Sequence, residues 1–409
     1  MLRVSEAQQR ILAAFSPLSP EDIPLSAALG RVVAENTLAR DQLPLFDNSA
    51  MDGYALLARD TGEATPDRPV RLRIVGAVPA GRVLDRPMRD GETARILTGA
   101  ALPLGADAVI QQEMVTVDSD ELLVRAAVAP RTNIRYAGED VKRGEQLLPR
   151  GAEIGPAELA LLASAGVSPV PVRRRPRVTI LATGDELVPA GELLGPGQIR
   201  ESNSTYLVAA VTRAGAEAIA LGIARDEEAD LREKLTRAQD ADLVISSGGV
   251  SVGDYDLVKQ ILGEQGEMDF WRVRMRPGKP LAFGRLGSTP LLGLPGNPVS
   301  AAVTFELFAR PAIRQMLGAA SVFRQRIEVA LDGSDVKQED RERYVRARLY
   351  AQDGVLRARP TGDQRSHIIT SLRGANVYLV IPIGDGLIRS GERVPALLLN
   401  DGLPWGDEG

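Results

Sequence analysis

The chain has 409 residues, more than one ordinary hydrophobic core accommodates, so several domains are expected. Apolar residues make up 44% and charged residues 25% of it, and its formal net charge of −5 argues against a general nucleic-acid-binding protein. Cysteine is absent and His367 is the single histidine, which excludes disulfides, thiolate nucleophiles, thiolate metal sites and histidine-rich zinc sites. A bound metal ion would therefore depend on oxygen ligands, as Mg²⁺ does.

The first 45 residues are predicted to form a helix, a turn and a second helix. Ser5 and Gln8 have the spacing of a capping box that opens an amphipathic helix. The N-terminal stretch lacks the apolar core and the cleavage site of a secretory signal, and no apolar run reaches the ~18–20 residues of a membrane span. We therefore expect a cytoplasmic protein that binds neither membrane nor nucleic acid.

Residues 46–137 contain short alternating runs between turn residues, which predicts strands. A helix is predicted to follow, with Pro156 near its start and Gly166 beyond its end. The stretch "PVRRRPRV" at 171–178 crowds proline and basic residues together. We interpret it as a solvated linker at a domain boundary near residue 172.

From residue 177 the pattern changes to alternating strands and helices, which predicts a parallel sheet covered by helices on both faces. After about residue 322 only strands and turns are predicted. There, "QDG" between two alternating runs is a hairpin signal, and we expect a small β-barrel or sandwich.

Polar stretches follow four of the strands predicted after residue 177. They are "TGDE" (Thr183–Glu186), "RDEE" with Asp226, "SSGGVSVGDYD" at 246–256, and "GLPGNP" (Gly293–Pro298). In an open parallel sheet, ligands bind beyond the carboxyl ends of the strands, so these stretches are expected to form one site.

The glycine-rich stretch combines two opposing features. Its bare backbone N–H groups suit a phosphate, whereas Asp254 and Asp256 would repel one by on the order of 4 kcal/mol per charge pair. A divalent cation between the acids and the phosphate reverses the sign of that interaction. The sequence therefore predicts a phosphorylated ligand that is handled with a metal ion.

Each acid also has a purely structural interpretation. Asp226 and Asp254 stand where predicted helices start and suit an N-cap, and Asp256 lies in a first helical turn, where the helix dipole favours an acid. Turn chemistry alone accounts for Asp185, but less readily for Glu186.

Cations for an anionic ligand are present in two further stretches. "RMRPGKP" places Arg276 and Lys279 around a Pro-Gly turn, and "GDQRSHI" holds Ser366 and His367 in a polar turn. Taken singly, these stretches are also ordinary exposed turns, and a lone histidine is more often structural than catalytic.

Several stretches together resemble one family, the molybdopterin molybdenumtransferases, represented by bacterial MoeA and the E domain of gephyrin. They span residues 46 to 368 in the order and spacing of that family. They are "FDNSAMDGYA", "ILTGA", "GEDV", "TGDEL", "SSGGVSVGDYD", "RPGKP", "GLPGNPVSA" and "GDQRSHI".

The resemblance implies a multidomain α/β plus β architecture. Its parts are an N-terminal helical and mixed domain at 1–45 and 138–171, an inserted β-rich domain at 46–137, a molybdopterin-binding doubly wound α/β domain at 172–320, and a C-terminal β-barrel-like domain at 321–409. It also implies an elongated homodimer whose active clefts use residues of both subunits.

The implied reaction inserts molybdate into adenylylated molybdopterin, with Mg²⁺ assisting the release of AMP, as the last common step of molybdenum cofactor biosynthesis. A transient contact with the molybdopterin adenylyltransferase is implied as well.

The resemblance also assigns roles to individual residues. Catalytic roles fall on Asp52, Thr98, Asp140, Glu186, Asp256 and Lys279, of which Glu186 and Asp256 would bind Mg²⁺. Substrate-binding roles fall on Gly248, Gly249, Ser251, Asp226, Arg276, Pro295, Gly296, Asn297, Pro298, Arg346 and Ser366. Arg276 stands where several relatives have lysine, which keeps the charge but replaces a point charge with a planar fork.

Two other functions are weighed against this one. A molybdopterin adenylyltransferase shares the α/β module and its glycine loop, but it normally lacks the N-terminal and barrel regions. A non-catalytic scaffold, as gephyrin is at synapses, is disfavoured because no adenylyltransferase domain and long linker precede these motifs.

Overall fold

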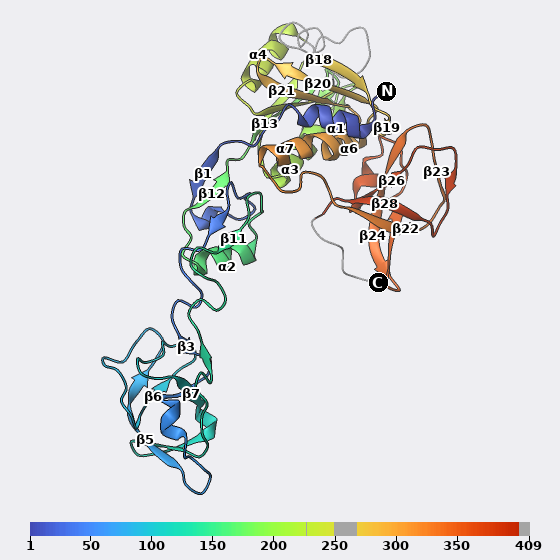
Figure 1. Cartoon of the computed structure of the whole chain (residues 1–409). Helices are drawn as coiled ribbons and strands as arrows, with labels where there is room; N and C mark the ends of the chain where they lie inside the picture. Colours follow the sequence, from blue (N-terminus) through green and yellow to red (C-terminus); the bar gives the residue numbers. More distant parts are fainter. Residues whose placement is uncertain (226, 249–267, 401–409) are drawn as a thin grey trace.

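The computed structural model describes residues 1–225, 227–248 and 268–400 of the chain. The molecule is elongated, with an α/β body and a β-barrel at one end, a narrow middle region, and a separate β-rich body at the other end (Figure 1). No helix in the described part of the chain is long and apolar enough to cross a membrane.

The separate body is built on a six-stranded sheet in the order β7-β4-β6-β5-β9-β8, in which only β5 and β6 run parallel. Apolar residues pack into one cluster on each side of this sheet. Its elements are β3 (Asn48–Ser49), β4 (Gly53–Leu56), η2 (Ala58–Thr61), β5 (Val70–Val78), β6 (Glu92–Ile96), β7 (Ala108–Gln111), η3 (Gln112–Met114), β8 (Val115–Asp118), β9 (Glu121–Val124) and β10 (Ile134–Arg135).

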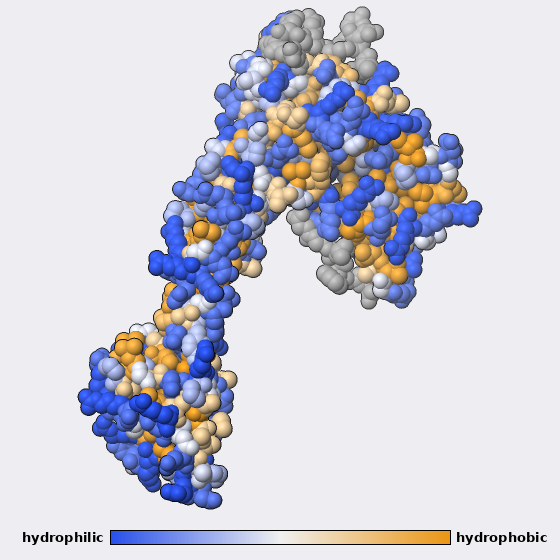
Figure 2. Space-filling view, viewed as in Figure 1, coloured by the Kyte–Doolittle hydropathy of each residue, from blue (hydrophilic) through white to orange (hydrophobic). Residues whose placement is uncertain are grey.

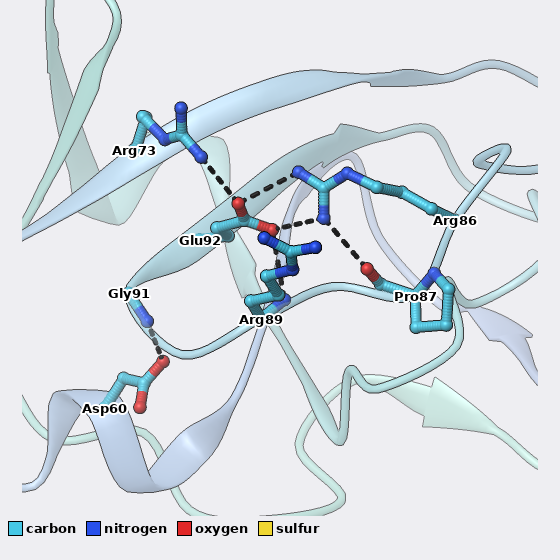
Figure 3. A network of polar contacts seen from close by, with 7 residues as sticks. All are labelled: Asp60, Arg73, Arg86, Pro87, Arg89, Gly91 and Glu92. Atoms are coloured by element: carbon cyan, nitrogen blue, oxygen red, sulfur yellow. Dashed lines mark hydrogen bonds and ion pairs between the residues drawn. The ribbon is translucent and has the colours of Figure 1, made fainter.

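A buried carboxylate stabilises the start of β6. Figure 3 shows Glu92, which is only 3% exposed, between the guanidinium groups of Arg73 and Arg86. Arg86 donates two hydrogen bonds of 2.7 and 2.9 Å, Arg73 donates one of 2.7 Å, and the backbone N–H of Arg89 donates one of 3.0 Å. The bonds from Arg86, then Arg89 and Arg73, outweigh burial and lower the pKa of Glu92 to about 2.

The middle region consists of two short antiparallel pairs, β1 with β12 and β2 with β11, packed on one helix. The second helix that we predicted within residues 1–45 is wrong. A strand and a single helical turn occupy its place, because Pro17, Pro20 and Pro24 remove the N–H groups that a helix needs. The elements are β1 (Pro20–Ile23), η1 (Leu25–Ala27), β2 (Thr37–Leu38), β11 (Gln146–Leu148), α2 (Pro156–Ser164) and β12 (Val170–Arg173).

The basic stretch at 171–178 is not the solvated linker that we predicted. Arg173 donates from its guanidinium to the carbonyl oxygens of Leu18 and Ala34 at 2.7 and 3.2 Å. Arg174 forms a two-bond ion pair with Asp242, at 2.8 and 2.7 Å, at the start of the α/β body. The charges of this stretch therefore join the middle region to the α/β body.

The α/β body contains a six-stranded sheet in the order β16-β13-β17-β21-β20-β18. The first four strands are parallel as predicted. β20 runs antiparallel to them, because β20 and β21 form a hairpin, and β18 pairs antiparallel with β20 at the edge of the sheet. The strands are β13 (Arg177–Thr183), β16 (Glu217–Ala224), β17 (Leu243–Ser247), β18 (Met268–Arg272), β20 (Pro280–Leu286) and β21 (Thr289–Leu294).

Helices cover both faces of this sheet, as predicted. On one face α1, α3, α6 and α7 pack into the largest apolar cluster, and on the other face α4 packs on β13 and β17. The helices, and a short strand pair beside them, are α1 (Val4–Leu12), β14 (Leu187–Val188), β15 (Ile199–Arg200), α3 (Asn203–Arg213), α4 (Glu228–Ala238), α6 (Pro298–Thr304), η4 (Phe305–Ala309) and α7 (Arg310–Met316).

The capping box predicted for the first helix is wrong. Ser5 lies inside α1, whose N-cap is Arg3 and has no side-chain cap hydrogen bond. Gln8 instead donates a 3.0 Å hydrogen bond to the carbonyl oxygen of Leu307. That oxygen lies in a π-helical turn, where Pro311 has no N–H to complete the α-helical pattern.

The C-terminal strands form a closed barrel, since β24 pairs with both β25 and β26 in the ring β24-β25-β22-β28-β26. The predicted hairpin at "QDG" is confirmed: Asp353 and Gly354 both have positive φ, as a two-residue hairpin turn requires. The elements are β19 (Met275–Arg276), β22 (Arg326–Leu331), β23 (Val336–Lys337), β24 (Glu342–Gln352), β25 (Val355–Pro360), η5 (Ile369–Leu372), β26 (Val377–Ile381), β27 (Leu387–Ile388) and β28 (Arg393–Leu398).

We expect Glu92→Gln to lower the thermal unfolding midpoint at pH 7, because the amide keeps the shape but loses the charge that Arg73 and Arg86 surround. The pKa of Glu92 is about 2 in the folded chain, below the ~4.3 of an unfolded glutamate. The stabilisation is therefore complete above the unfolded value and is lost as the pH falls toward 2.

Thermal melts followed by circular dichroism at several pH values test this expectation. The difference between the native and variant midpoints should shrink as the pH falls below about 5. Glu121→Gln is the control, because Glu121 pairs with Arg71 at the surface and should contribute little. Equal midpoints for native protein and Glu92→Gln at pH 7 would contradict the prediction.

Candidate functional site

Three loops leave the same edge of the α/β sheet. Ser247 at the end of β17 is in register with Ala182 of β13 and Leu294 of β21. The stretches that follow, "TGDE", "GG" and "PGNP", therefore begin side by side, as the sequence predicted for them. Asp226, Gly249, Ser251, Asp254 and Asp256 lie outside the described residues.

The backbone of the second loop lies against the first too closely for a side chain at Gly248, and the third loop is in ordinary contact with it. Gly248 has a φ of 94°, and a Cβ there would lie 2.8 Å from the carbonyl oxygen of Thr183 and 3.0 Å from its hydroxyl oxygen. A Cβ on Gly296 would lie 3.8 Å from the Cα of Gly248. Glycine at position 248 is thus required by both its conformation and its contacts.

Asn203, which the sequence analysis did not single out, joins two of the loops. It is the first residue of α3, and its amide nitrogen donates hydrogen bonds of 2.7 Å to the Ser247 hydroxyl and 2.8 Å to the Gly296 carbonyl oxygen. Asparagine is common at the start of a helix, so the sequence alone suggests only a capping role for it. Nothing in the sequence pairs this residue with positions 44 and 93 residues further on.

Glu186 is exposed at the end of the first loop, and its carboxylate lies over Gly184, where any side chain would collide with it. A cleft of about 620 Å³ opens beside it, lined by Asp185, Glu201, Thr205 and Arg225 among others. This cleft lies between the β14–β15 pair and the start of α3.

The described residues do not by themselves form a metal cage, since no group of three or more acidic or histidine side chains in them could hold a metal ion. Mg²⁺ commonly binds through one or two carboxylates together with substrate phosphates and water. The exposed carboxylate of Glu186 suits that mode of binding, and Asp256, its expected partner, is outside the described residues.

The barrel contacts the third loop. The backbone N–H of Val299, in the first turn of α6, donates a 3.2 Å hydrogen bond to the carbonyl oxygen of Ser366. The "GDQRSHI" turn and the "LPGNP" loop, which the sequence places in different domains, are thus neighbours. Asn297 and Pro298 stand at the N-cap and first position of α6, and Pro295 is buried.

Arg346 holds this turn from inside the barrel. It is only 1% exposed, and its guanidinium donates to the Ser371 hydroxyl at 3.1 Å and to the carbonyl oxygens of Asp363 and Arg365 at 3.4 Å. Its backbone N–H donates to the Gln364 side chain at 2.9 Å. Burial lowers the pKa of Arg346 to about 10, so it stays protonated at neutral pH.

Arg276 and Lys279 differ in what they contact. One guanidinium nitrogen of Arg276 donates to both oxygens of Glu339, at 2.7 and 2.8 Å. Burial alone would raise the pKa of Glu339, but Arg276 and the nearby Arg343 hold it below its ordinary value. Lys279 has no acidic partner among the residues that the structure describes, and its backbone oxygen accepts a 2.8 Å hydrogen bond from Val273.

Asp52 and Thr98 form a pair in the separate β-rich body. Asp52 accepts hydrogen bonds of 2.7 Å from the backbone N–H and from the hydroxyl of Thr98. These bonds, with the charge of Arg95, hold the pKa of Asp52 below its ordinary value. Asp140 is exposed where the middle region meets this body, its N–H donating to Leu43 at 3.0 Å.

One chain does not bring these acids to the sheet edge. The body that carries Asp52 and Thr98 lies at the opposite end of the molecule from β13, β17 and β21 (Figure 1). Its surface shows hydrophobic residues as well as polar ones (Figure 2). Leu45, Phe46, Met51 and Leu97 are its exposed large apolar residues adjacent in sequence to these motifs.

Three family descriptions match the chain in succession. "MoeA N-terminal region (domain I and II)" matches residues 2–166, "Probable molybdopterin binding domain" matches 179–315, and "MoeA C-terminal region (domain IV)" matches 333–399.

Relatives match over nearly the whole length. Molybdopterin molybdenumtransferase 2 of Mycobacterium tuberculosis is 40% identical over 93% of this chain and 96% of its own. Molybdopterin molybdenumtransferase of Haemophilus influenzae is 36% identical over 96% and 98%. A crystal structure of the molybdopterin biosynthesis MoeA protein from Pyrococcus horikoshii has a TM-score of 0.81 at 33% identity, covering 97% of this chain and 100% of that one.

We expect Arg346→Lys to lower the free energy of unfolding by about 2 kcal/mol, because a lysine cannot reach all the acceptors that the buried fork contacts. Hydrogen exchange should also quicken in the 362–367 turn. Chemical denaturation and exchange mass spectrometry measure the two effects.

Arg348→Lys is the matched control, since Arg348 lies two residues along β24 and is exposed. Its effect should stay within about 0.5 kcal/mol. Equal losses of stability in the two variants would refute a special role for Arg346.

Proposed function

The chain belongs to the MoeA family, and we propose that it is a molybdopterin molybdenumtransferase, which inserts molybdenum into molybdopterin during molybdenum cofactor biosynthesis. Full-length similarity to proteins of that name supports the assignment. One structural observation supports the proposed chemistry. Three loops begin side by side at one edge of the sheet, and the exposed carboxylate of Glu186 lies in the first of them.

The substrates that we propose are adenylylated molybdopterin and molybdate, with AMP as a product. The glycine-rich stretch that begins at Gly248 suits a phosphate, and Glu186 is an exposed acid that would repel the phosphate unless a cation lay between them. Glu186 and Asp256 are the residues that would hold Mg²⁺, which would supply positive charge for the phosphate of the leaving AMP. The residues of this chain bind and orient the two substrates.

Molybdate is proposed to bind between the α/β body and the barrel. The contact between Val299 and Ser366 supports this position, because it brings the barrel turn to the start of α6. Lys279 is less buried than Arg346 and, unlike Arg276, has no acidic partner in the described chain, so it suits an oxyanion. Arg346 is assigned to hold the turn, and Arg276 to hold the barrel through Glu339, instead of contacting molybdate themselves.

A homodimer with shared clefts is proposed to bring Asp52, Thr98 and Asp140 to the sheet edge of a second copy. The separation of the two ends of the molecule supports this, as do the exposed apolar residues near Asp52 (Figures 1 and 2). A transient contact with the molybdopterin adenylyltransferase is proposed in addition, since that enzyme class would supply the adenylylated substrate.

Neither alternative function has an observation in its favour. If the chain were an adenylyltransferase, that function would not account for its N-terminal and C-terminal MoeA regions. ATP consumption with molybdopterin in the absence of molybdate would favour that reading. A stoichiometric protein partner bound independently of molybdopterin would favour a scaffold.

The shared cleft is tested by complementation between Asp52→Ala and Glu186→Ala chains. Each variant alone should be inactive, because every cleft then lacks one acid. Heterodimers purified with two different tags should regain a substantial part of the activity, because one of their two clefts is intact. Verified heterodimers without any recovery would exclude a cleft that combines these two residues from different chains.

The molybdate position is tested by Ser366→Ala combined with Lys279→Ala. Losing hydrogen bonds to a charged group should raise the half-saturating molybdate concentration about 10-fold or more, with a smaller change for adenylylated molybdopterin. His367→Ala should leave the titration unchanged, because a permanently charged oxyanion needs no group that titrates near neutral pH. An unchanged midpoint in the double variant would place molybdate elsewhere.

A further inference from the structure

Two adjacent serines at the end of β17 face opposite sides of the sheet. Ile245 belongs to the apolar cluster that contains α3 and α6, whereas Val244 belongs to the cluster that contains α4. Since side chains alternate along a strand, Ser247 faces the α3 side and Ser246 the α4 side. Both are buried, at 3% and 1% exposure, so neither is an ordinary surface serine.

The hydroxyl of Ser247 accepts one hydrogen bond and donates none within the described residues. Asn203 donates to the Ser247 oxygen at 2.7 Å, which leaves the hydroxyl hydrogen to point elsewhere. Within the described residues that hydrogen has no acceptor. The neighbouring Ser246 hydroxyl has no hydrogen-bond partner in the described chain either, so an unused hydroxyl does not by itself indicate a ligand. Ser247 differs because it stands at the sheet edge where the loops begin and is contacted by Asn203.

The neighbouring backbone cannot supply the same donor. The N–H of Gly248 already donates to the carbonyl oxygen of Leu294 at 3.1 Å. Two donors are compared at the strand end, the Ser247 hydroxyl and the Gly248 N–H. Only the hydroxyl has a hydrogen that is not already donated within the described residues. The second hydrogen bond of Asn203, to Gly296, fixes the amide, and the fixed amide in turn orients the hydroxyl.

We propose that Ser247, held by Asn203, donates its hydroxyl hydrogen to a phosphate oxygen of the bound substrate. This rests on the proposed function, because it takes the phosphate of an adenylylated substrate to be the ligand of this edge. Ser247 is then a substrate-binding residue and Asn203 a positioning residue. In many glycine-rich loops a backbone N–H donates a hydrogen bond to the phosphate, and here the Ser247 hydroxyl takes that role.

The experiment is calorimetric titration of the full-length protein with AMP and Mg²⁺, and with adenosine as the ligand that lacks the phosphate. Ser247→Ala should weaken AMP binding about 10- to 100-fold, the usual scale for a hydrogen bond to a charged group. Adenosine binding should change little. Ser246→Ala is the matched control and should leave both affinities unchanged, because alternation along β17 places its hydroxyl on the α4 side of the sheet.

Asn203→Ala tests the positioning role. It should weaken AMP binding less than Ser247→Ala, because the hydroxyl is still present but no longer oriented. The double variant should bind AMP no worse than Ser247→Ala alone, whereas a general structural defect would add to the loss.

Three results would overturn the proposal: unchanged AMP affinity in Ser247→Ala, an equal loss of adenosine affinity, or an equal loss in Ser246→Ala. Native protein that fails to bind AMP would overturn it as well. The proposed function is judged separately, by molybdenum insertion with the native protein. A native protein that inserts no molybdenum, but whose AMP binding depends on Ser247, would reject the function and keep this inference.

Discussion

The contact between backbones at one edge of the α/β sheet is the constraint on which the proposed site depends. Gly248 lies against Thr183 with no room for a side chain, and Gly296 lies close to Gly248. Parallel strands in register bring the loops together, and Asn203 then fixes the second loop to the third. Backbone packed this closely leaves only small, directed polar groups to meet a ligand.

The barrel is attached to this edge by polar contacts of two kinds. The Val299–Ser366 hydrogen bond joins backbone to backbone, and the Arg276–Glu339 pair fixes β19, the segment between β18 and β20 that pairs with β24, to the loop before β24. The buried Arg346 stabilises the barrel turn by donating hydrogen bonds to the carbonyl oxygens of Asp363 and Arg365. Arg276 and Arg346, which the family resemblance marks as substrate-binding, thus both have protein partners in the structure.

The far body is stabilised by its own interactions, which is why it can stand apart. Its sheet has apolar clusters on both sides, and the buried Glu92 accepts hydrogen bonds from two arginines where β6 begins. The Arg174–Asp242 pair fixes the middle region to the α/β body by charge instead of a flexible linker. The elongated shape separates the β-rich body, which carries Asp52, from the α/β body, which carries Glu186 (Figure 1).

The sequence by itself determined the alternation of strands and helices after residue 177, the "QDG" hairpin and the loops that meet at the sheet edge, because local periodicity and turn chemistry carry these features. It misjudged the segment around Pro17–Pro24, the capping of α1 and the basic stretch before β13, where proline and distant partners outweigh local pattern. Only the tertiary structure decided that Asn203 orients Ser247, that Arg346 is buried and that Arg276 is paired. The physical reason is that a side chain's partner is set by packing between segments far apart in the chain, which no local pattern records.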